Sequence, residues 1–183
     1  MAKATTIREA LKRWETENSG EEISEAKQVS LAFQFPPIEK MDSSLDVLTN
    51  CEKLSLSTNM IDRITGLTKL RNLKILALGR NRIKNFTGLD ALANSLEQLW
   101  ISYNFIERLR TVLPLKNLRI LYMAHNLVKE WEEIDILVNL PNLKELIFVG
   151  NPLEELYVDK VEWFSEVKVR LPNLEKLDSN LLL

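Results

Sequence analysis

The chain has few of the residues on which metal sites, disulfide frameworks and phosphate-binding loops depend. Its 183 residues include one cysteine, one histidine and five glycines. A single cysteine cannot close an intrachain disulfide, and these counts exclude a metal site built from several cysteine or histidine ligands. No Walker or dinucleotide-binding glycine pattern occurs in the sequence. We therefore expect no metal and no cofactor.

Long hydrophobic runs and an excess of one charge are also missing. Charged or polar residues interrupt every leucine cluster, so the sequence predicts no signal peptide and no membrane-spanning helix. The 24 basic and 26 acidic residues give a formal charge of −2, which provides no general attraction to nucleic acid. These features predict an intracellular, soluble protein whose partners include neither nucleic acid nor a membrane.

Leucine, by contrast, is abundant, with 33 of the 183 positions. That bias indicates a core built mostly from one aliphatic side chain in a regular arrangement. The regularity is a repeat, because Leu54–Asn59 reads L-x-L-x-x-N and four similar segments follow at intervals of 22 to 25 residues. Each segment ends in asparagine, and the five asparagines are Asn59, Asn81, Asn104, Asn126 and Asn151.

This pattern is typical of a leucine-rich repeat. The alternating leucines face one side of a short strand and the intervening residues face the other. No repeat can bury its leucines alone, so neighbouring strands stack in parallel and each end needs a lid. We predict an α/β leucine-rich-repeat solenoid with a parallel β-sheet on one face, short helical or 3₁₀ return arms on the other, and helical caps at both ends.

The domain organisation follows from the position of the repeats. We interpret residues 1–183 as a single leucine-rich-repeat domain. Residues 1–24 are expected to form an N-terminal helical cap, 25–50 a degenerate first repeat, 51–153 five repeat units and 154–183 a C-terminal cap. The caps are predicted from apolar residues at helical spacing. These are Ile7, Ala10, Leu11 and Trp14, preceded by the capping-box pair Thr6 and Glu9, and in the C-terminal cap Val161, Phe164, Val167 and Leu171.

We interpret the five asparagines as structural. The turn after each strand leaves backbone groups inside the coil, and an amide side chain offers both a donor and an acceptor for them. An internal ladder of hydrogen bonds is therefore favoured over a role in ligand binding.

The sequence does not indicate an enzyme. Cys51 is expected to point into the core and His125 to point outward from a different repeat, so the two do not form a nucleophilic pair. The acidic runs Glu130–Glu133 and Glu154–Glu155 lie in loops after a repeat asparagine, and we expect both to be solvated surface.

The outward-facing residues of the strands, which we call the strand face, are those that the fold does not need. Three large side chains are expected side by side on this solvent-facing surface. Exposed apolar patches of this kind usually bind a partner. The predicted partner-binding residues are Trp100, Tyr122 and Ile147, with Ile75, Ile120 and Val149 around them and Arg80, Tyr103 and His125 beside them. Cover by the chain's own terminal segment and a dimer through the same face are the alternatives.

Several segments carry residues that a generic repeat does not require, notably Pro36–Asp42, Leu99–Asn104 and Val149–Glu155. On these segments the chain resembles, almost end to end, the leucine-rich-repeat light chain family of axonemal outer-arm dynein. The resemblance implies a non-catalytic protein of the cytoplasm and cytoskeleton, located in the axoneme of the cilium or flagellum.

The same resemblance implies a partner. A member of this family would bind the outer-arm dynein heavy chain at the microtubule-binding domain of its stalk, through the strand face, and would regulate the motor. Trp100, Tyr122 and Ile147 would be the apolar anchors and Arg80, Tyr103 and His125 the rim of the interface. Tubulin is a further candidate contact. The alternative is a regulatory or targeting subunit of a protein phosphatase, which this class of repeat also permits.

Overall fold

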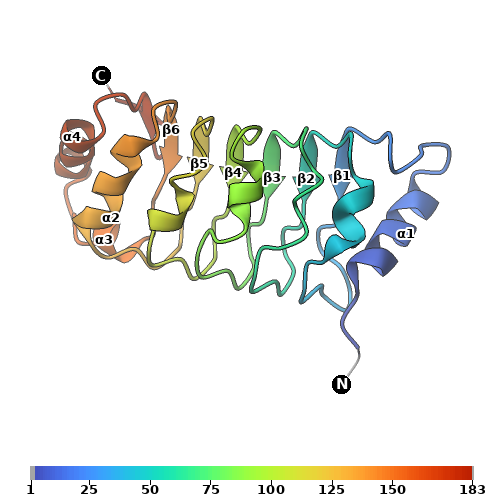
Figure 1. The fold of residues 1–183 in the computed structure, drawn as a ribbon. Helices are drawn as coiled ribbons and strands as arrows, with labels where there is room; N and C mark the ends of the chain where they lie inside the picture. The colour runs from blue at the N-terminus through green and yellow to red at the C-terminus, as the bar shows by residue number, and fades with distance from the viewer. Residues whose placement is uncertain (1–2, 183) are drawn as a thin grey trace.

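The computed structural model describes residues 3–182, so residues 1–2 and 183 of the two predicted caps lie outside the described residues. The strands line up in chain order in one sheet along the solenoid (Figure 1). Strands β1 to β7 are parallel, and β8 runs antiparallel to β7. Their bounds are β1 Gln28–Ser30, β2 Lys53–Ser55, β3 Ile75–Ala77, β4 Gln98–Trp100, β5 Ile120–Tyr122, β6 Glu145–Ile147, β7 Lys176–Leu177 and β8 Asn180–Leu181.

The opposite face carries short return arms, as the repeat predicts. Most of the arms contain a single turn of helix, because each has few residues in which to reverse direction before the next strand begins. The helical pieces are η1 Ser43–Val47, η2 Leu89–Leu92, η3 Arg110–Val112, α2 Trp131–Ile136 and η4 Leu137–Asn139. The parallel sheet, these arms and the leucine-rich-repeat neighbours reported below confirm the predicted fold class.

The core is a stack of the inward-facing strand residues. The register pairs Leu54 with Leu76, Leu76 with Leu99 and Leu99 with Leu121, and each of these side chains is fully buried. Full burial of one leucine stabilises the fold by about 1.5–3 kcal/mol. The stack therefore holds consecutive repeats together and gives the strand face a fixed geometry.

The repeat asparagines join each turn to its neighbours. The side-chain Oδ1 of Asn126 accepts a hydrogen bond from the backbone N–H of Ile106 at 3.0 Å, and its Nδ2 donates to the carbonyl oxygens of Ile101 at 3.1 Å and Met123 at 3.0 Å. The other four asparagines are also buried and make the same kind of contacts. Each amide thus satisfies backbone groups from two successive repeats.

The N-terminal lid is the helix α1, Ile7–Glu17. Thr6 and Glu9 form the predicted capping box, in which Thr6 Oγ1 accepts from the N–H of Glu9 at 3.2 Å and the Glu9 carboxylate accepts from the N–H of Thr6 at 2.8 Å. The predicted apolar face is confirmed, because Ile7, Ala10 and Leu11 are buried, together with Trp14.

The C-terminal lid consists of α3, Pro152–Glu155, and α4, Lys160–Arg170. The predicted packing face of α4 is wrong in part, because Val161 is 71 % exposed and Trp163 is fully buried. The reason is aromatic packing: the Trp163 ring stacks on Phe148 of the last repeat with ring centroids 5.6 Å apart, and this large ring buries more apolar surface than Val161 could. The other predicted residues do face the core, because Val167 and Leu171 are buried and Phe164 is partly buried, and Trp163 takes the place expected of Val161.

The acidic runs also differ from the prediction that they lie in solvated loops, because Glu132 and Glu133 belong to α2 and Glu154 and Glu155 belong to α3. Glu133 and Glu154 are buried rather than solvated. Glu133 accepts hydrogen bonds from the backbone N–H of Leu109 at 2.6 Å and from the Arg108 guanidinium at 2.9 Å. Glu154 accepts from the N–H of Gly150 at 3.0 Å and pairs with Lys160. Glu133 thus supplies the acceptor for a buried backbone N–H, and Glu154 supplies one for a backbone N–H that is partly buried.

Candidate functional site on the strand face

The three large side chains predicted to be neighbours are neighbours in the sheet. Trp100 pairs in register with Tyr122, and Tyr122 pairs with Ile147. The rings of Trp100 and Tyr122 are stacked with centroids 6.0 Å apart and an angle of 17° between their planes. All three side chains are partly exposed. We call Trp100, Tyr122 and Ile147 the central row.

Apolar residues flank the central row on both sides. Ile75 and Ile120 lie on the adjacent outward position of the strands and are partly exposed, with Gln98 between them in the register. Val149 follows Ile147 beyond the end of its strand and is 41 % exposed. Ile75 and Ile120 are therefore separate contributors to the surface and do not form a continuous apolar column.

The aromatic rings of the central row are fixed by polar neighbours. The Lys53 ammonium lies 5.1 Å from the centre of the Trp100 ring, close enough for a cation–π contact. The indole Nε1 of Trp100 has no hydrogen-bond partner within residues 3–182, so this ring is held by its stacking on Tyr122 and its contact with Lys53. The Tyr122 hydroxyl donates to Glu145 Oε1 at 2.7 Å, and Glu145 also lies 3.7 Å from the Lys176 ammonium.

The environment of Tyr122 raises the pKa of its hydroxyl group. Burial, followed by the hydrogen bond to Glu145 and the negative charge of that carboxylate, raises the pKa of Tyr122 from 10.0 to about 12. The neutral phenol is thus the form that the folded state favours. Its contribution to stability is complete below pH 10, the unfolded pKa, and is lost as the pH rises through the folded pKa of about 12.

A spectroscopic titration tests this shift. We expect the difference in tyrosinate absorbance between the native protein and Tyr122→Phe to show a group with a pKa near 12. In Glu145→Gln this pKa should fall but stay above the ordinary value, because burial remains. A Tyr122 signal that titrates at the ordinary tyrosine pKa in the native protein would contradict the hydrogen-bonded, half-buried arrangement.

Arg80, Tyr103 and His125 form a stacked rim beside the central row. Each precedes a repeat asparagine and adopts a left-handed backbone, with φ of 55°, 59° and 52°. The Arg80 guanidinium lies 4.4 Å from the centre of the Tyr103 ring. The Tyr103 and His125 rings lie 4.4 Å apart with 19° between their planes. The three side chains therefore lie on one another across three consecutive repeats and present a preorganised edge.

Gly150 ends the stacked rim, a role that was not predicted from the sequence. It occupies the next equivalent position, with φ of 76°, and a Cβ placed there would lie 2.3 Å from His125 Nδ1. A side chain at this position would collide with the imidazole ring. The signal was available, because glycine stands here where the preceding repeats carry threonine, arginine, tyrosine and histidine.

A substitution at Gly150 tests this packing. Gly150→Ala is expected to lower the free energy of unfolding by about 1–2 kcal/mol, because of left-handed strain and displacement of the His125 ring. In a His125→Ala background the same substitution should lower the free energy of unfolding by less, because the backbone strain at residue 150 remains but the imidazole ring with which the new side chain collides is absent. Denaturant unfolding of the four proteins of this cycle measures both values. Equal losses in the two backgrounds would show that the ring does not rest on Gly150.

The described terminal helices do not lie over this surface. Figure 1 shows α1 and α4 at opposite ends of the solenoid. At the α1 end a groove of about 470 Å³ opens between the helix and the strand face, and it is lined by Trp14, Asn18, Lys53, Ala77 and Trp100, among others. The central row therefore continues into an open groove at this end.

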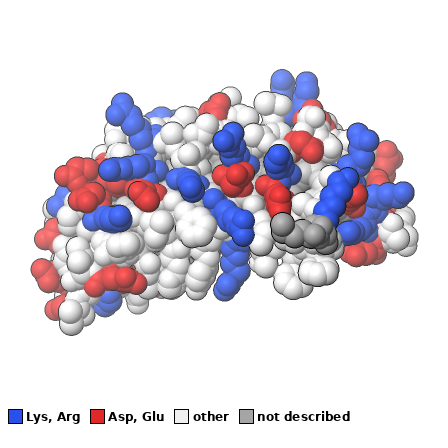
Figure 2. Space-filling view, turned by 90° about the horizontal axis from the view of Figure 1, so that it is seen from below, with Lys and Arg blue, Asp and Glu red and all other residues white. Residues whose placement is uncertain are grey.

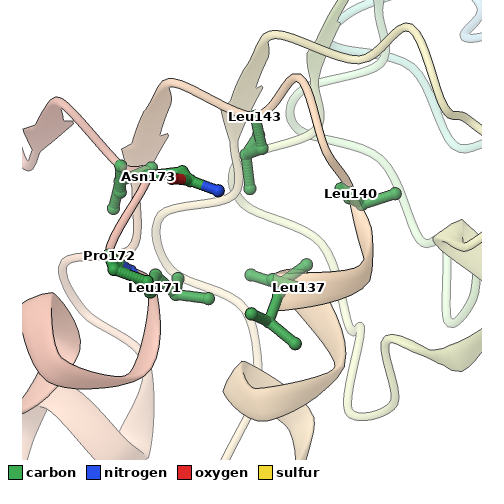
Figure 3. Close-up of a pocket in the computed structure, with 8 residues that line it drawn as sticks. Leu137, Leu140, Leu143, Leu171, Pro172 and Asn173 are labelled. Carbon is green, nitrogen blue, oxygen red and sulfur yellow. The ribbon is translucent and has the colours of Figure 1, made fainter.

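Other potential sites in the described part of the chain offer little chemistry. Cys51 is fully buried, and burial raises the pKa of its thiol, whereas His125 is exposed in the stacked rim. No three His, Cys, Asp or Glu side chains converge on a metal-binding position within residues 3–182. The crevice beside Leu137 and Leu171, drawn in Figure 3, has a volume of about 10 Å³, which is at most the room for one water molecule.

Side chains of both charges lie on the side of the molecule that Figure 2 shows. Figure 2 shows the molecule from below, with Lys, Arg, Asp and Glu side chains intermixed over the upper part of the view and a largely uncharged surface in the lower middle part. Arg108 is paired with Glu133. Among the described helices none is long and apolar enough to cross a membrane.

Comparison with known proteins identifies the family. Comparison with protein-family models finds no match. The chain is, however, 58 % identical to dynein axonemal light chain 1 of Danio rerio over 180 residues, which cover 98 % of this chain and 93 % of that protein. The Homo sapiens protein of the same name is 58 % identical over 178 residues, covering 97 % and 93 %. The Chlamydomonas reinhardtii protein is 49 % identical over 181 residues, covering 97 % and 91 %.

This chain belongs to the axonemal dynein light chain 1 family. Membership confirms the resemblance found in the sequence and places the chain in the axoneme of a cilium or flagellum, which is part of the cytoskeleton. Proteins of this family and fold are typically non-catalytic.

Solved structures support the fold of this axonemal dynein light chain 1 family member. Internalin C2 of Listeria monocytogenes aligns with a TM-score of 0.59 at 28 % identity and covers 77 % of this chain and 58 % of that one. A leucine-rich-repeat protein of Leptospira interrogans aligns with a TM-score of 0.62 at 24 % identity and covers 81 % of this chain and 36 % of that one. These likenesses concern the solenoid and not its partner.

Proposed function

We propose that this chain is a non-catalytic light chain that binds the heavy chain of outer-arm dynein through its strand face. The binding site on the heavy chain is the microtubule-binding domain of the stalk. The observation that carries the proposal is the central row: Trp100, Tyr122 and Ile147 stand side by side on the outward face of consecutive strands, where the fold has no use for them. The relatives' shared name, dynein axonemal light chain 1, supports association with a dynein heavy chain.

The surface has the composition of a protein–protein interface. Tryptophan, tyrosine and arginine are the residues most often responsible for binding energy, and they act best at the centre of an interface that excludes water. Here Trp100 and Tyr122 lie within the central row, and Arg80, with Tyr103 and His125, lies in the stacked rim. Because the rings are already stacked in the free protein, little conformational entropy is lost when a partner covers them.

The proposed regulation of the motor follows from the stiffness of the solenoid. Consecutive repeats share buried leucines and asparagine hydrogen bonds, so the solenoid behaves as a rigid body. A rigid body attached at the microtubule-binding domain changes how that domain is oriented toward the microtubule, and through it the output of the motor. Tubulin next to that site is the proposed further contact.

Co-purification tests the proposal. The full chain should retain an isolated outer-arm microtubule-binding domain and should not retain a fragment of the same heavy chain that lacks the stalk. Retention of the stalkless fragment alone would place the binding site elsewhere on the motor. Capture of a phosphatase catalytic subunit from ciliary extract, with dynein absent, would favour the phosphatase alternative instead.

A further inference from the structure

The C-terminal lid carries a second exposed apolar surface that shares no residue with the strand face. Leu156 is 74 % exposed, Val158 is 99 % exposed and Val161 is 71 % exposed. The three lie within six residues of one another, from the end of α3 to the first turn of α4. Single exposed aliphatic side chains are ordinary on protein surfaces, whereas a cluster of large ones indicates a contact surface.

A groove of about 510 Å³ opens beside these side chains. Its lining includes Leu153, Trp131 and Tyr157. The Trp131 ring meets the edge of Tyr157 with centroids 5.9 Å apart and lies 5.4 Å from the ring of Trp163. The Arg170 guanidinium covers Trp131 at 4.3 Å from the ring centre. Contacts on several sides fix this aromatic lining, so the groove exists before any partner arrives.

The border of the groove is acidic. The segments 129–132 and 153–162, which supply the groove and the exposed aliphatic side chains, carry five exposed carboxylates and two lysines, Lys129 and Lys160. Lys160 is paired with the buried Glu154, which leaves the border with an excess of negative charge. Figure 2 shows Asp and Glu side chains around uncharged surface at the left end, where α4 lies in Figure 1. The five carboxylates are Glu130, Glu132, Glu155, Asp159 and Glu162.

We propose that this C-terminal groove docks a segment of another protein that carries large apolar side chains flanked by lysine or arginine. The apolar side chains would cover Leu156 and Val158 and enter the groove over Trp131, while the basic ones would face the carboxylates. Charge complementarity selects this occupant. A second copy would bring one acidic border against another, and an anionic membrane would be repelled in the same way. The light chain would then hold two partners, one on the strand face and one at its C-terminal end.

A binding assay with a defined probe tests the proposal. The probe is a fluorescently labelled amphipathic helical peptide of leucine and lysine, and the control probe has glutamate in place of every lysine. We expect the full chain to bind the lysine peptide and not the glutamate peptide. Both Leu156→Ser/Val158→Ser and Glu130→Lys/Glu132→Lys should weaken binding of the lysine peptide at least tenfold in fluorescence anisotropy.

Matched variants separate the groove from other surfaces. Val138→Ser removes an aliphatic side chain that is 50 % exposed on a return arm, and Glu39→Lys reverses an exposed charge far from the groove in sequence. Both should bind the lysine peptide as the native chain does, and so should Trp100→Ala/Tyr122→Ala, whatever its effect on dynein. Loss of peptide binding in the Trp100/Tyr122 variant, undiminished binding in the two groove variants, or equal binding of both peptides would overturn the proposal. A dimer in sedimentation that Val158→Ser dissociates would overturn it as well.

Discussion

Replacing Trp100 and Tyr122 together with alanine is expected to abolish binding of the heavy-chain domain while the solenoid stays folded. Each ring is a candidate hot spot, and truncation of a hot-spot residue costs about 2 kcal/mol or more. Two of them would cost about 4 kcal/mol, which is roughly a thousandfold in Kd. Calorimetric titration with the isolated microtubule-binding domain measures this loss.

The fold should survive because both rings point away from the core. The inward neighbours Leu99 and Leu121 are fully buried and untouched by the substitutions. Circular dichroism and denaturant unfolding of the double variant check this. The matched control is Val138→Ala/Val169→Ala, which removes two exposed side chains outside the strand face, and it should bind like the native chain. Native affinity in the Trp100/Tyr122 variant would remove the central row from the interface.

Asn126→Ala is expected to cause a large loss of stability without touching the strand face. The substitution leaves the N–H of Ile106 and the carbonyl oxygens of Ile101 and Met123 without their partner inside the solenoid. A buried polar group without a partner costs about 1–3 kcal/mol, so we expect a loss of about 3 kcal/mol in the free energy of unfolding. For a chain of this size that corresponds to a fall of roughly 6–12 °C in Tm.

The control for Asn126 is an asparagine outside the ladder. Asn142 is exposed, and its side chain donates to the carbonyl oxygen of Lys116 at 2.8 Å. Asn142→Ala should cost less than about 1 kcal/mol, because water can replace that contact. Calorimetric unfolding of both variants makes the comparison. If Asn126→Ala were as stable as Asn142→Ala, the asparagine ladder would not join the repeats as described.

The backbone of the solenoid could be predicted from the sequence because its causes are local and periodic. Leucines two residues apart define the strands, and the next asparagine marks each turn, so the register of Leu54, Leu76 and Leu99 follows from counting. The lid α1 could be predicted for a similar reason, since the capping box of Thr6 and Glu9 involves residues three positions apart.

The remaining features depend on contacts between residues far apart in the sequence. Trp163 displaces Val161 from the buried face of α4 because its ring finds Phe148 in the last repeat. Glu133 is buried because a backbone N–H at Leu109, in the preceding repeat, needs an acceptor. Helical spacing and local charge carry no information about either partner.

The candidate site likewise has one part that could be predicted from the sequence and one part that could not. Alternation within the strands predicted that Trp100 and Tyr122 face outward on neighbouring strands, and the register places them there. The stacking of the rim could not be derived in the same way, because it depends on left-handed backbone at Tyr103 and His125, although the glycine at position 150 is visible in the sequence. Such conformations come from the turn geometry of the repeat and not from the identity of the residue.

Photo-cross-linking in assembled axonemes tests the strand-face interface most directly. A photoreactive phenylalanine analogue is placed at Ile75, on the strand face, and in a second protein at Val138, on a return arm. We predict that the analogue at Ile75 cross-links to the microtubule-binding domain of an outer-arm heavy chain and that the analogue at Val138 does not. Cross-links to the heavy chain from Val138, with none from Ile75, would contradict it.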